Sequence, residues 1–357
     1  MALCSPGYGS AGLQSMKATV MITGGAGYIG SHIALLLRRS GYSVVVFDNL
    51  SSGNGWAVAK DSLVLGDILD TPFLVEMMKA HQVKTVIHLA AKSNVMESFL
   101  QPDDYFVINV QGTRSVLDAA VAADVRQIVF SSSAAVYGDA VCGMVREDSA
   151  LHPLSPYGQS KLDAERLVVD RCVGCGIGHV IFRYFNVLGG YPSAGIGQCN
   201  LASNHLMHKC IQSAHDGSTL SIYGHDYATE DGTAVRDYIH VRDLAALHGC
   251  ALRHLERGGG SMLVNAGYGR GYSVLAFMRT FQMVTGVAIC HRFCPPRQGD
   301  PAALVADVGR LRENFDWIPE HAAVEKMIGD SWEWEHSAAR QAWISGASQE
   351  SARETPN

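Results

Sequence analysis

Tyr157 and Lys161 are the residues of this sequence whose types and spacing most directly suggest chemistry. They follow Ser155 and Pro156, a combination typical of a helix start, and residues four positions apart share one face of a helix. A lysine ammonium beside a phenol stabilises the phenolate and lowers the tyrosine pKa from its free value of about 10. The pattern therefore predicts that Tyr157 acts as a base near neutral pH.

A run of three serines, Ser131–Ser133, directly follows a predicted strand at 126–130. This position lies at the carboxyl edge of a parallel sheet, where folds of this type bind ligands. We interpret Ser133 as a hydrogen-bond partner for a substrate hydroxyl. Ser131 and Ser132 are interpreted as loop hydroxyls that bond within the protein.

A glycine-rich turn at the first predicted strand indicates a dinucleotide site. Gly24, Gly27 and Gly30 lie between the apolar strand 18–22 and the helix 31–39. The first glycine permits the turn, the second lets backbone amides approach a pyrophosphate, and the third lets the helix pack closely on its strand. The N-terminus of the helix then faces the phosphates with its partial positive charge.

An acidic residue at the end of the second predicted strand favours NAD over NADP. Asp48 follows Gly30 by 18 residues, and no arginine comes directly after it. A carboxylate at this position can bind both ribose hydroxyls and would repel a 2′-phosphate. Asp67 and Ile68, after a short predicted strand, stand where an adenine contact is common.

Strands alternate with helices along the first half of the chain, which predicts an α/β fold with a Rossmann-type, doubly wound parallel sheet. After about residue 186 the alternation weakens, and loops rich in Gly, Asn, His and Asp dominate to about residue 240. This change predicts a smaller α/β substrate-binding lobe. The predicted strands are 18–22, 43–47, 63–65, 84–89, 126–130 and 178–183, and the predicted helices are 31–39, 70–81, 110–122 and 157–172.

The composition describes a folded protein with a sizeable core. Of 357 residues, 47% are hydrophobic and 17% charged, which excludes a disordered chain, a coiled coil and a collagen-like repeat. The net charge is −6 without a cluster of lysines and arginines, so no nucleic-acid partner is predicted. No apolar run reaches the roughly 18 residues of a membrane span. The expected parts are a flexible leader at 1–16, an NAD-binding domain at 17–185, a second lobe at 186–340 that is partly interleaved with the first, and a polar tail at 341–357.

Nine cysteines at scattered positions are typical of reduced thiols in a cytoplasmic protein. Cys172 and Cys175 have the spacing of half a zinc or redox site, but no second pair matches them. We interpret the pair as a coincidence near a helix end and predict no metal site. Residues 1–15 lack the cationic start and long apolar stretch of a secretory signal.

Several stretches between residues 17 and 335 resemble the extended short-chain dehydrogenase/reductase superfamily and, within it, the UDP-glucose 4-epimerase family. The glycine motif marks only the superfamily, whereas the long segment Glu230–Val241 is close to diagnostic for the epimerase branch. The other matching stretches are Thr23–Ser31, Ser131–Gly138, Ser155–Lys161 and Arg183–Asn186.

The resemblance implies a catalytic triad, an NAD site and a site for a UDP-sugar. The triad would be Ser133, Tyr157 and Lys161, which would also touch the cofactor. The other implied NAD contacts are Gly24, Gly27, Tyr28, Ile29, Gly30, Asp48, Asn49, Leu50, Ser51, Ser52, Asp67, Ile68, Leu89, Ala90, Ala91, Ser93, Asn109 and Phe185. Besides Ser133 and Tyr157, the implied substrate contacts are Asn186, Asn204, His205, Leu206, Ser221, Ile222, Tyr223, Arg236, Arg297, Asp300 and Leu304.

The implied reaction is reversible inversion at C4 of a UDP-hexose, UDP-galactose to UDP-glucose, in galactose metabolism. Tyr157 would take the proton of the 4-hydroxyl. Tightly bound NAD would be recycled as it accepts and returns a hydride, and a 4-keto intermediate would turn over in between. The resemblance also implies a homodimer joined through helices near 102–122 and 157–172.

Other functions stay open at this point. Another nucleotide-sugar epimerase would act on a UDP-N-acetylhexosamine or a UDP-pentose. A nucleotide-sugar dehydratase needs an extra acid in the serine region, where this chain has Ser133 and Ala134. A non-catalytic NAD-binding regulator would not need the intact triad, and a net oxidoreductase would exchange NAD with solution.

Five positions depart from the family pattern. Ser93 stands where many members have a lysine, Ile108 replaces the first residue of an Asn-Asn pair, and Ala135 replaces a frequent threonine. His205 stands where an asparagine is frequent. Leu304 occupies the position where a bulky tyrosine excludes N-acetyl sugars and a small residue admits them, so specificity for such sugars stays open.

Overall fold

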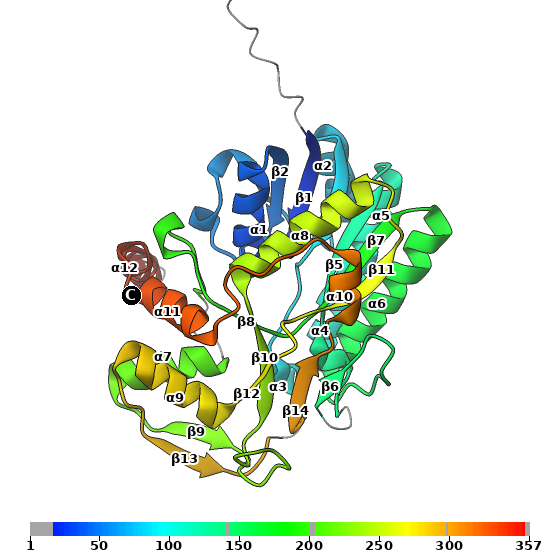
Figure 1. Ribbon diagram of the computed structural model, residues 1–357. Helices are drawn as coiled ribbons and strands as arrows, with labels where there is room; N and C mark the ends of the chain where they lie inside the picture. Colours follow the sequence, from blue (N-terminus) through cyan, green and yellow to red (C-terminus); the bar gives the residue numbers. More distant parts are fainter. Residues whose placement is uncertain (1–16, 140–142, 200–203, 298, 354–357) are drawn as a thin grey trace, which may run out of the picture.

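The computed structural model describes residues 17–139, 143–199, 204–297 and 299–353, and the predicted leader lies outside them, as do Cys4 and Cys142. Figure 1 shows a larger lobe, built on the blue to green first half of the chain, and a smaller lobe beside it.

The larger lobe is built on a seven-stranded sheet in which each strand is parallel to its neighbours. The order β11-β7-β5-β4-β1-β2-β3 runs in opposite directions from β1, which is the doubly wound arrangement that the sequence predicted. The strands are β1 (Lys17–Thr23), β2 (Tyr42–Asp48), β3 (Leu63–Leu65), β4 (Val83–His88), β5 (Gln127–Ser133), β7 (Gly178–Tyr184) and β11 (Met262–Ala266).

Helices cover both faces of this sheet because its strands are apolar on both sides. Successive side chains of β1 point to opposite faces: Val20 and Ile22 join one hydrophobic cluster, and Met21 joins the other. The first cluster includes side chains of α1 (Tyr28–Arg39) and α8 (Val241–Glu256). The second includes side chains of α2 (Thr71–Ala80), α5 (Gly112–Ala122) and α6 (Pro156–Cys175).

Two elements of the larger lobe come from the second half of the chain. Helix α8 packs against α1, and β11 adds the strand next to β7. The sequence analysis predicted neither element, because it assigned residues 186–340 to the second lobe. Helix α12 (Ala338–Arg353) covers much of the predicted polar tail.

The smaller lobe contains a five-stranded sheet with the path β12-β10-β14-β6, to which β8 adds beside β10, and a separate pair, β13 and β9. Helices α7, α9 and α11 lie beside these strands (Figure 1). The bounds are β6 (Met144–Val145), β8 (Asn186–Leu188), β9 (Leu220–Tyr223), β10 (Val235–His240), β12 (Gly271–Ser273), β13 (His291–Cys294), β14 (Ala303–Ala306), α7 (Leu206–Asp216), α9 (Val274–Thr285) and α11 (Val324–Glu335).

A π-helical segment interrupts the helix that was predicted near 102–122. It covers Val107–Gln111 (η3), between α4 (Pro102–Phe106) and α5. Such segments are rare and occur frequently at functional sites.

The described helices do not include one with the length and apolar character needed to cross a bilayer. The remaining short elements are η1 (Gly55–Ala57), η2 (Lys60–Ser62), α3 (Val95–Leu100), η4 (Ala134–Val136), η5 (Pro192–Ala194) and α10 (Gly309–Asn314).

Candidate active site

Most of the predicted NAD residues lie at or just after the carboxyl ends of strands of the large sheet, so the parallel sheet brings them to one edge. Those of the glycine turn follow β1, Asp48–Ser52 end and follow β2, and Asp67 and Ile68 follow β3. Leu89, Ala90, Ala91 and Ser93 follow β4, Ser133 ends β5, and Phe185 follows β7.

The glycine turn has the tight geometry that its sequence predicts. Gly24 has a φ of +69°, and a Cβ there would lie 2.6 Å from the Ala90 nitrogen. A Cβ at Gly30 would lie 2.5 Å from the Gly24 oxygen, so the helix needs a glycine to approach the turn. A Cβ at Gly27 would meet a single described atom within 4 Å, the Gly24 oxygen at 3.2 Å. The outer side of the turn is therefore open, which fits a pyrophosphate at the start of α1.

Asp48 holds the loop after β2 against this turn. Its Oδ2 accepts a hydrogen bond from the Ala26 amide at 2.9 Å, and its Oδ1 accepts one from the Leu50 amide at 2.8 Å. Burial raises the pKa of this carboxyl group. Each carboxylate oxygen can accept a second hydrogen bond, so the arrangement still allows Asp48 to bind ribose hydroxyls.

Tyr157, Ser133 and Lys161 come together at the end of β5. Burial raises the pKa of Tyr157, and the neighbouring Ser133 hydroxyl lowers it by a smaller amount. The Lys161 ammonium donates to the Ser131 carbonyl at 2.8 Å and lies over the Phe130 ring. Burial lowers the pKa of Lys161 to about 8.

This geometry differs from the sequence argument in one respect. The sequence placed the Lys161 ammonium as the group that lowers the Tyr157 pKa. In the structure, that ammonium bonds the Ser131 carbonyl, and Ser133 is the group that lowers the phenol pKa. Tyr157 and Lys161 are four residues apart on α6, but the Lys161 ammonium is bonded to the backbone at the end of β5.

Asn109, a predicted cofactor contact, connects three segments of the site. Its Oδ1 accepts a hydrogen bond from the Lys92 amide at 2.9 Å, and its Nδ2 donates to the Lys92 carbonyl at 3.0 Å and to Ser160 Oγ at 2.9 Å. Ser160 Oγ in turn donates to the Tyr157 carbonyl at 2.8 Å. The π-helical segment therefore fixes the loop after β4 relative to the catalytic helix.

A buried ion pair between Glu165 and Arg183 lies close to the triad, and it was not predicted from the sequence. Glu165, one turn after Lys161, accepts hydrogen bonds from Arg183 at 2.9 and 2.8 Å and another from the Ser132 hydroxyl. Both charged side chains are 4% exposed or less. The bond to Ser132 agrees with its interpretation as a satisfied loop hydroxyl. No local signal marks this pair, because its members lie on α6 and β7.

The predicted nucleotide-binding arginines gather in the smaller lobe. Asp300 accepts from Arg297 at 2.9 Å and lies 3.5 Å from Arg236, and the Arg297 guanidinium lies 4.6 Å from the centre of the Tyr223 ring. Forked guanidinium groups are suited to phosphate oxygens. Leu304 lies next to this group, since it pairs with Arg236 across β14 and β10.

The segment that carries Asp300 also contacts the approach to the catalytic helix. A Cβ at Gly299 would lie 3.5 Å from the Leu154 carbonyl, and Leu154 directly precedes Ser155, the N-cap of α6. The arginine cluster and Tyr157 are thus connected through a short length of chain. The other predicted substrate residues lie in the smaller lobe or at its border: Asn186 on β8, Asn204 before α7, His205 at its N-cap, Leu206 at its start, and Ser221 and Ile222 on β9.

Tyr227 is a further residue of this cluster that the sequence analysis missed. Its hydroxyl is buried without a hydrogen-bond partner among the described residues. The pKa of Tyr227 is raised by burial and by the charge of Asp300, whereas Arg236 and Arg297 lower it. A buried hydroxyl beside these charges can bond to a ligand. In the sequence, the only signal for Tyr227 is its position just before the diagnostic segment Glu230–Val241.

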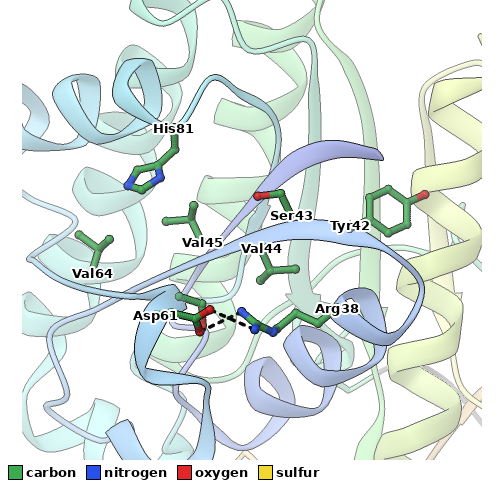
Figure 2. A pocket seen from close by; sticks show the side chains of 9 residues that line it. Arg38, Tyr42, Ser43, Val44, Val45, Asp61, Val64 and His81 are labelled. Carbon is green, nitrogen blue, oxygen red and sulfur yellow. Dashed lines mark hydrogen bonds and ion pairs between the residues drawn. The ribbon is translucent and has the colours of Figure 1, made fainter. Parts of the chain in front are cut away.

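Of two cavities in the structure, one is lined by predicted site residues and the other is not. A hollow of about 320 Å³ lies beside the start of β2. Figure 2 shows side chains that line it, among them the ion pair of Arg38 and Asp61. Because β2 runs from Tyr42 to Asp48, this hollow lies at the amino end of the sheet, away from the triad, and no predicted site residue lines it. A smaller cavity of about 40 Å³ is lined by Tyr28 and His205, one predicted cofactor contact and one predicted substrate contact.

The seven described cysteines are free. Cys172 and Cys175 lie in the last turn of α6, in agreement with their interpretation as a helix-end pair. Within the described ranges, no group of three or more His, Cys, Asp or Glu side chains is placed to hold a metal ion.

The fold and the open glycine turn define an NAD-dependent enzyme of the Rossmann type, and the comparisons with known proteins agree. The profile of the NAD dependent epimerase/dehydratase family matches residues 20–267, and the chain belongs to this family. A UDP-glucose 4-epimerase from Azospirillum brasilense is 42% identical over 330 residues, which cover 92% of this chain and 95% of the relative. The resemblance stated from the sequence is therefore confirmed.

Two solved structures show the same fold. The UDP-glucose 4-epimerase from Brucella ovis in complex with NAD is 39% identical with a TM-score of 0.85, and the match covers 88% of this chain and 98% of the other. The UDP-glucose-4-epimerase from Stenotrophomonas maltophila, with bound NAD and formylated UDP-arabinopyranose, is 35% identical with a TM-score of 0.86. That match covers 92% of this chain and 100% of the other. The predicted fold class is confirmed.

Proposed function

We propose that this chain interconverts UDP-galactose and UDP-glucose by inverting C4 of the sugar. The observation that carries the proposal is the convergence of Ser133, Tyr157 and Lys161 at the carboxyl end of β5, on the same edge of the sheet as the glycine turn. The relatives described above, named as UDP-glucose 4-epimerases, support the same reaction. NAD is the cofactor, as predicted.

In this reaction, the triad acts on the sugar and the two arginines bind the diphosphate. Tyr157 takes the proton of the 4-hydroxyl, and Ser133 holds the sugar oxygen through a hydrogen bond. With a pKa of about 8, Lys161 keeps its charge near neutral pH, and its bond to the Ser131 carbonyl holds that charge at the end of β5, close to Ser133. Bound NAD supplies the acceptor and donor of the hydride. Arg236 and Arg297 hold the diphosphate, so the sugar itself stays free to turn over between the two hydride transfers.

A dehydratase is disfavoured by the charges around the triad. Elimination needs a further acid or base near the serine region. Glu165, the carboxylate one turn after Lys161, is held by Arg183 and by the Ser132 hydroxyl. Because both its oxygens are engaged in a buried ion pair, Glu165 is a structural group.

A proton-NMR assay of UDP-galactose with the purified protein, without added NAD, tests the proposal. We expect UDP-glucose to form, and we expect Tyr157→Phe to abolish turnover while UDP binding, measured by calorimetry, stays. Tyr42→Phe is the matched control, because that hydroxyl bonds Glu256 away from the triad. A preparation shown to contain NAD that leaves UDP-galactose unchanged would refute the proposal.

The same assay with UDP-N-acetylgalactosamine and UDP-xylose defines the sugar. Leu304 is 8% exposed and pairs with Arg236 across β14 and β10, and we propose that it lines the sugar site. Leucine is smaller than tyrosine, so the N-acetyl sugar is the competing substrate to test. Comparable rates on UDP-galactose and UDP-N-acetylgalactosamine would mean that the acetamide fits beside Leu304.

We also propose that the protein is a cytoplasmic homodimer joined through α5 and α6. Val169 and Val173 on α6 are 39% and 69% exposed, and Val121 on α5 is 37% exposed, so these helices present apolar side chains outward. Free thiols suit a reducing compartment. Sedimentation is expected to give twice the chain mass and to shift toward one chain in Val173→Asp. A monomeric wild-type protein would exclude the dimer.

A further inference from the structure

The loop that follows β2 folds back over the glycine turn. Its Asn54 amide donates to the Ala26 carbonyl at 2.8 Å, while the Ala26 amide donates to Asp48 at 2.9 Å. Gly53 lies close to the Asp48 carboxylate, since a Cβ at this glycine would lie 2.8 Å from Asp48 Oδ1. The loop and the turn are therefore joined along one side of the predicted dinucleotide site.

The far end of this loop reaches the smaller lobe through one aromatic contact. The indole of Trp56, in η1, stacks on that of Trp334, in α11, with ring centres 6.1 Å apart and planes 18° apart. The two rings differ in exposure: Trp56 is 42% exposed and Trp334 only 2%. One ring is thus a surface group on the loop, and the other is part of the core.

Trp334 is a rigid support for this contact. Its Nε1 donates to the Gln198 carbonyl at 2.8 Å, and a Cβ at Gly197 would lie 2.5 Å from its ring. The two lobes also meet nearby through Tyr28, the first residue of α1, whose hydroxyl donates to the Gly189 carbonyl at 2.7 Å. The start of α1, where a pyrophosphate would sit, therefore lies between a loop and a lobe that are fastened to each other.

We propose that the Trp56–Trp334 stack closes the loop over the dinucleotide site and slows the release of NAD. This inference rests on the proposed function, in which one NAD molecule is used, regenerated and retained. Release requires the loop to lift from the turn, and lifting it separates the two indoles. Trp56 is accordingly a positioning residue: it acts on cofactor retention through the loop and does not take part in the reaction.

The test measures NAD release directly and needs no epimerase turnover. NAD-loaded protein is diluted into ethanol and alcohol dehydrogenase, which convert each released NAD into NADH that is followed by absorbance. We expect Trp56→Ala to release NAD about tenfold faster, the effect of losing a stacked aromatic pair and its buried area. Trp56→Phe, which keeps a ring on Trp334, is expected to stay within about threefold of wild type.

Two further measurements separate retention from a general loss of structure. At saturating NAD, the kcat of Trp56→Ala on UDP-galactose is expected to match wild type, while the NAD concentration for half-maximal activity rises. Trp343→Ala is the control, because it removes an indole of the neighbouring α12 that packs against Arg340 at 4.7 Å. Wild-type release from Trp56→Ala, or equal release from both alanine variants, would overturn the inference. A protein that retains NAD but leaves UDP-galactose unchanged would instead refute only the proposed function.

Discussion

Replacing Lys161 by methionine is expected to stabilise the fold while it abolishes turnover. Burial lowers the pKa of Lys161 from 10.5 to about 8. Since one pKa unit corresponds to about 1.4 kcal/mol, keeping the charged ammonium in the folded protein at pH 7 costs about 3 kcal/mol. Methionine removes the charge but leaves the Ser131 carbonyl without its 2.8 Å hydrogen bond, which offsets about 1 kcal/mol. The expected net gain is about 2 kcal/mol.

The sign of this effect depends on pH. The folded pKa lies below the unfolded one, so between about pH 8 and pH 10.5 the unfolded chain binds more protons than the folded chain. The penalty is therefore complete below pH 8 and is lost as the pH rises through 10.5. Urea unfolding of both proteins, freed of NAD, at pH 7 and at pH 10.5 measures the free energy of unfolding directly.

The expected gain in Lys161→Met at pH 7 shrinks to zero or reverses at pH 10.5. Lys79→Met is the matched control, because Lys79 is an exposed lysine in the last turn of α2 and its loss should change stability by less than about 0.5 kcal/mol. A variant that is no more stable than wild type at pH 7, or that gains equally at both pH values, would refute the burial argument.

Three other substitutions test separate parts of the site. Glu165→Ala is expected to lower the free energy of unfolding by about 3–5 kcal/mol in urea titrations, because it leaves the buried Arg183 uncompensated; a loss below about 1 kcal/mol would contradict this. Gly24→Ala is expected to abolish NAD binding, measured by calorimetry, since its Cβ would press on the Ala90 backbone; wild-type affinity would exclude a tight turn. Tyr227→Phe is expected to leave stability within about 1 kcal/mol but to weaken UDP binding about tenfold, because its buried hydroxyl lacks a partner; unchanged affinity would remove this hydroxyl from the nucleotide site.

The elements that the sequence predicted best are those whose signal is local. The apolar run at 18–22, the glycine turn and the helix start at Pro156 are each defined by a few neighbouring residues, and the structure has β1, the turn and α6 there. Six of the seven strands of the large sheet were predicted. The seventh, β11, was missed because β8, β9 and β10 lie between it and its partner β7 in the sequence.

The features that the sequence did not predict depend on pairing across the chain. Glu165 and Arg183 are ordinary charged residues in their own segments, and only the packing of α6 on β7 makes them a buried pair. The π-helical turn at Asn109 likewise has no local marker, since its hydrogen bonds go to Lys92 and Ser160. The roles of the predicted site residues in binding and catalysis remain predictions for the experiments above.

The return of the chain to the larger sheet has a consequence for how this protein can be divided. A fragment ending at residue 185 would lack β11 and α8, so β7 would become an unprotected sheet edge and the α1 side of the sheet would lose part of its apolar cover. Such a fragment is expected to aggregate. The part that binds the cofactor therefore cannot be transplanted as a module, and the two lobes are expected to unfold as one cooperative unit.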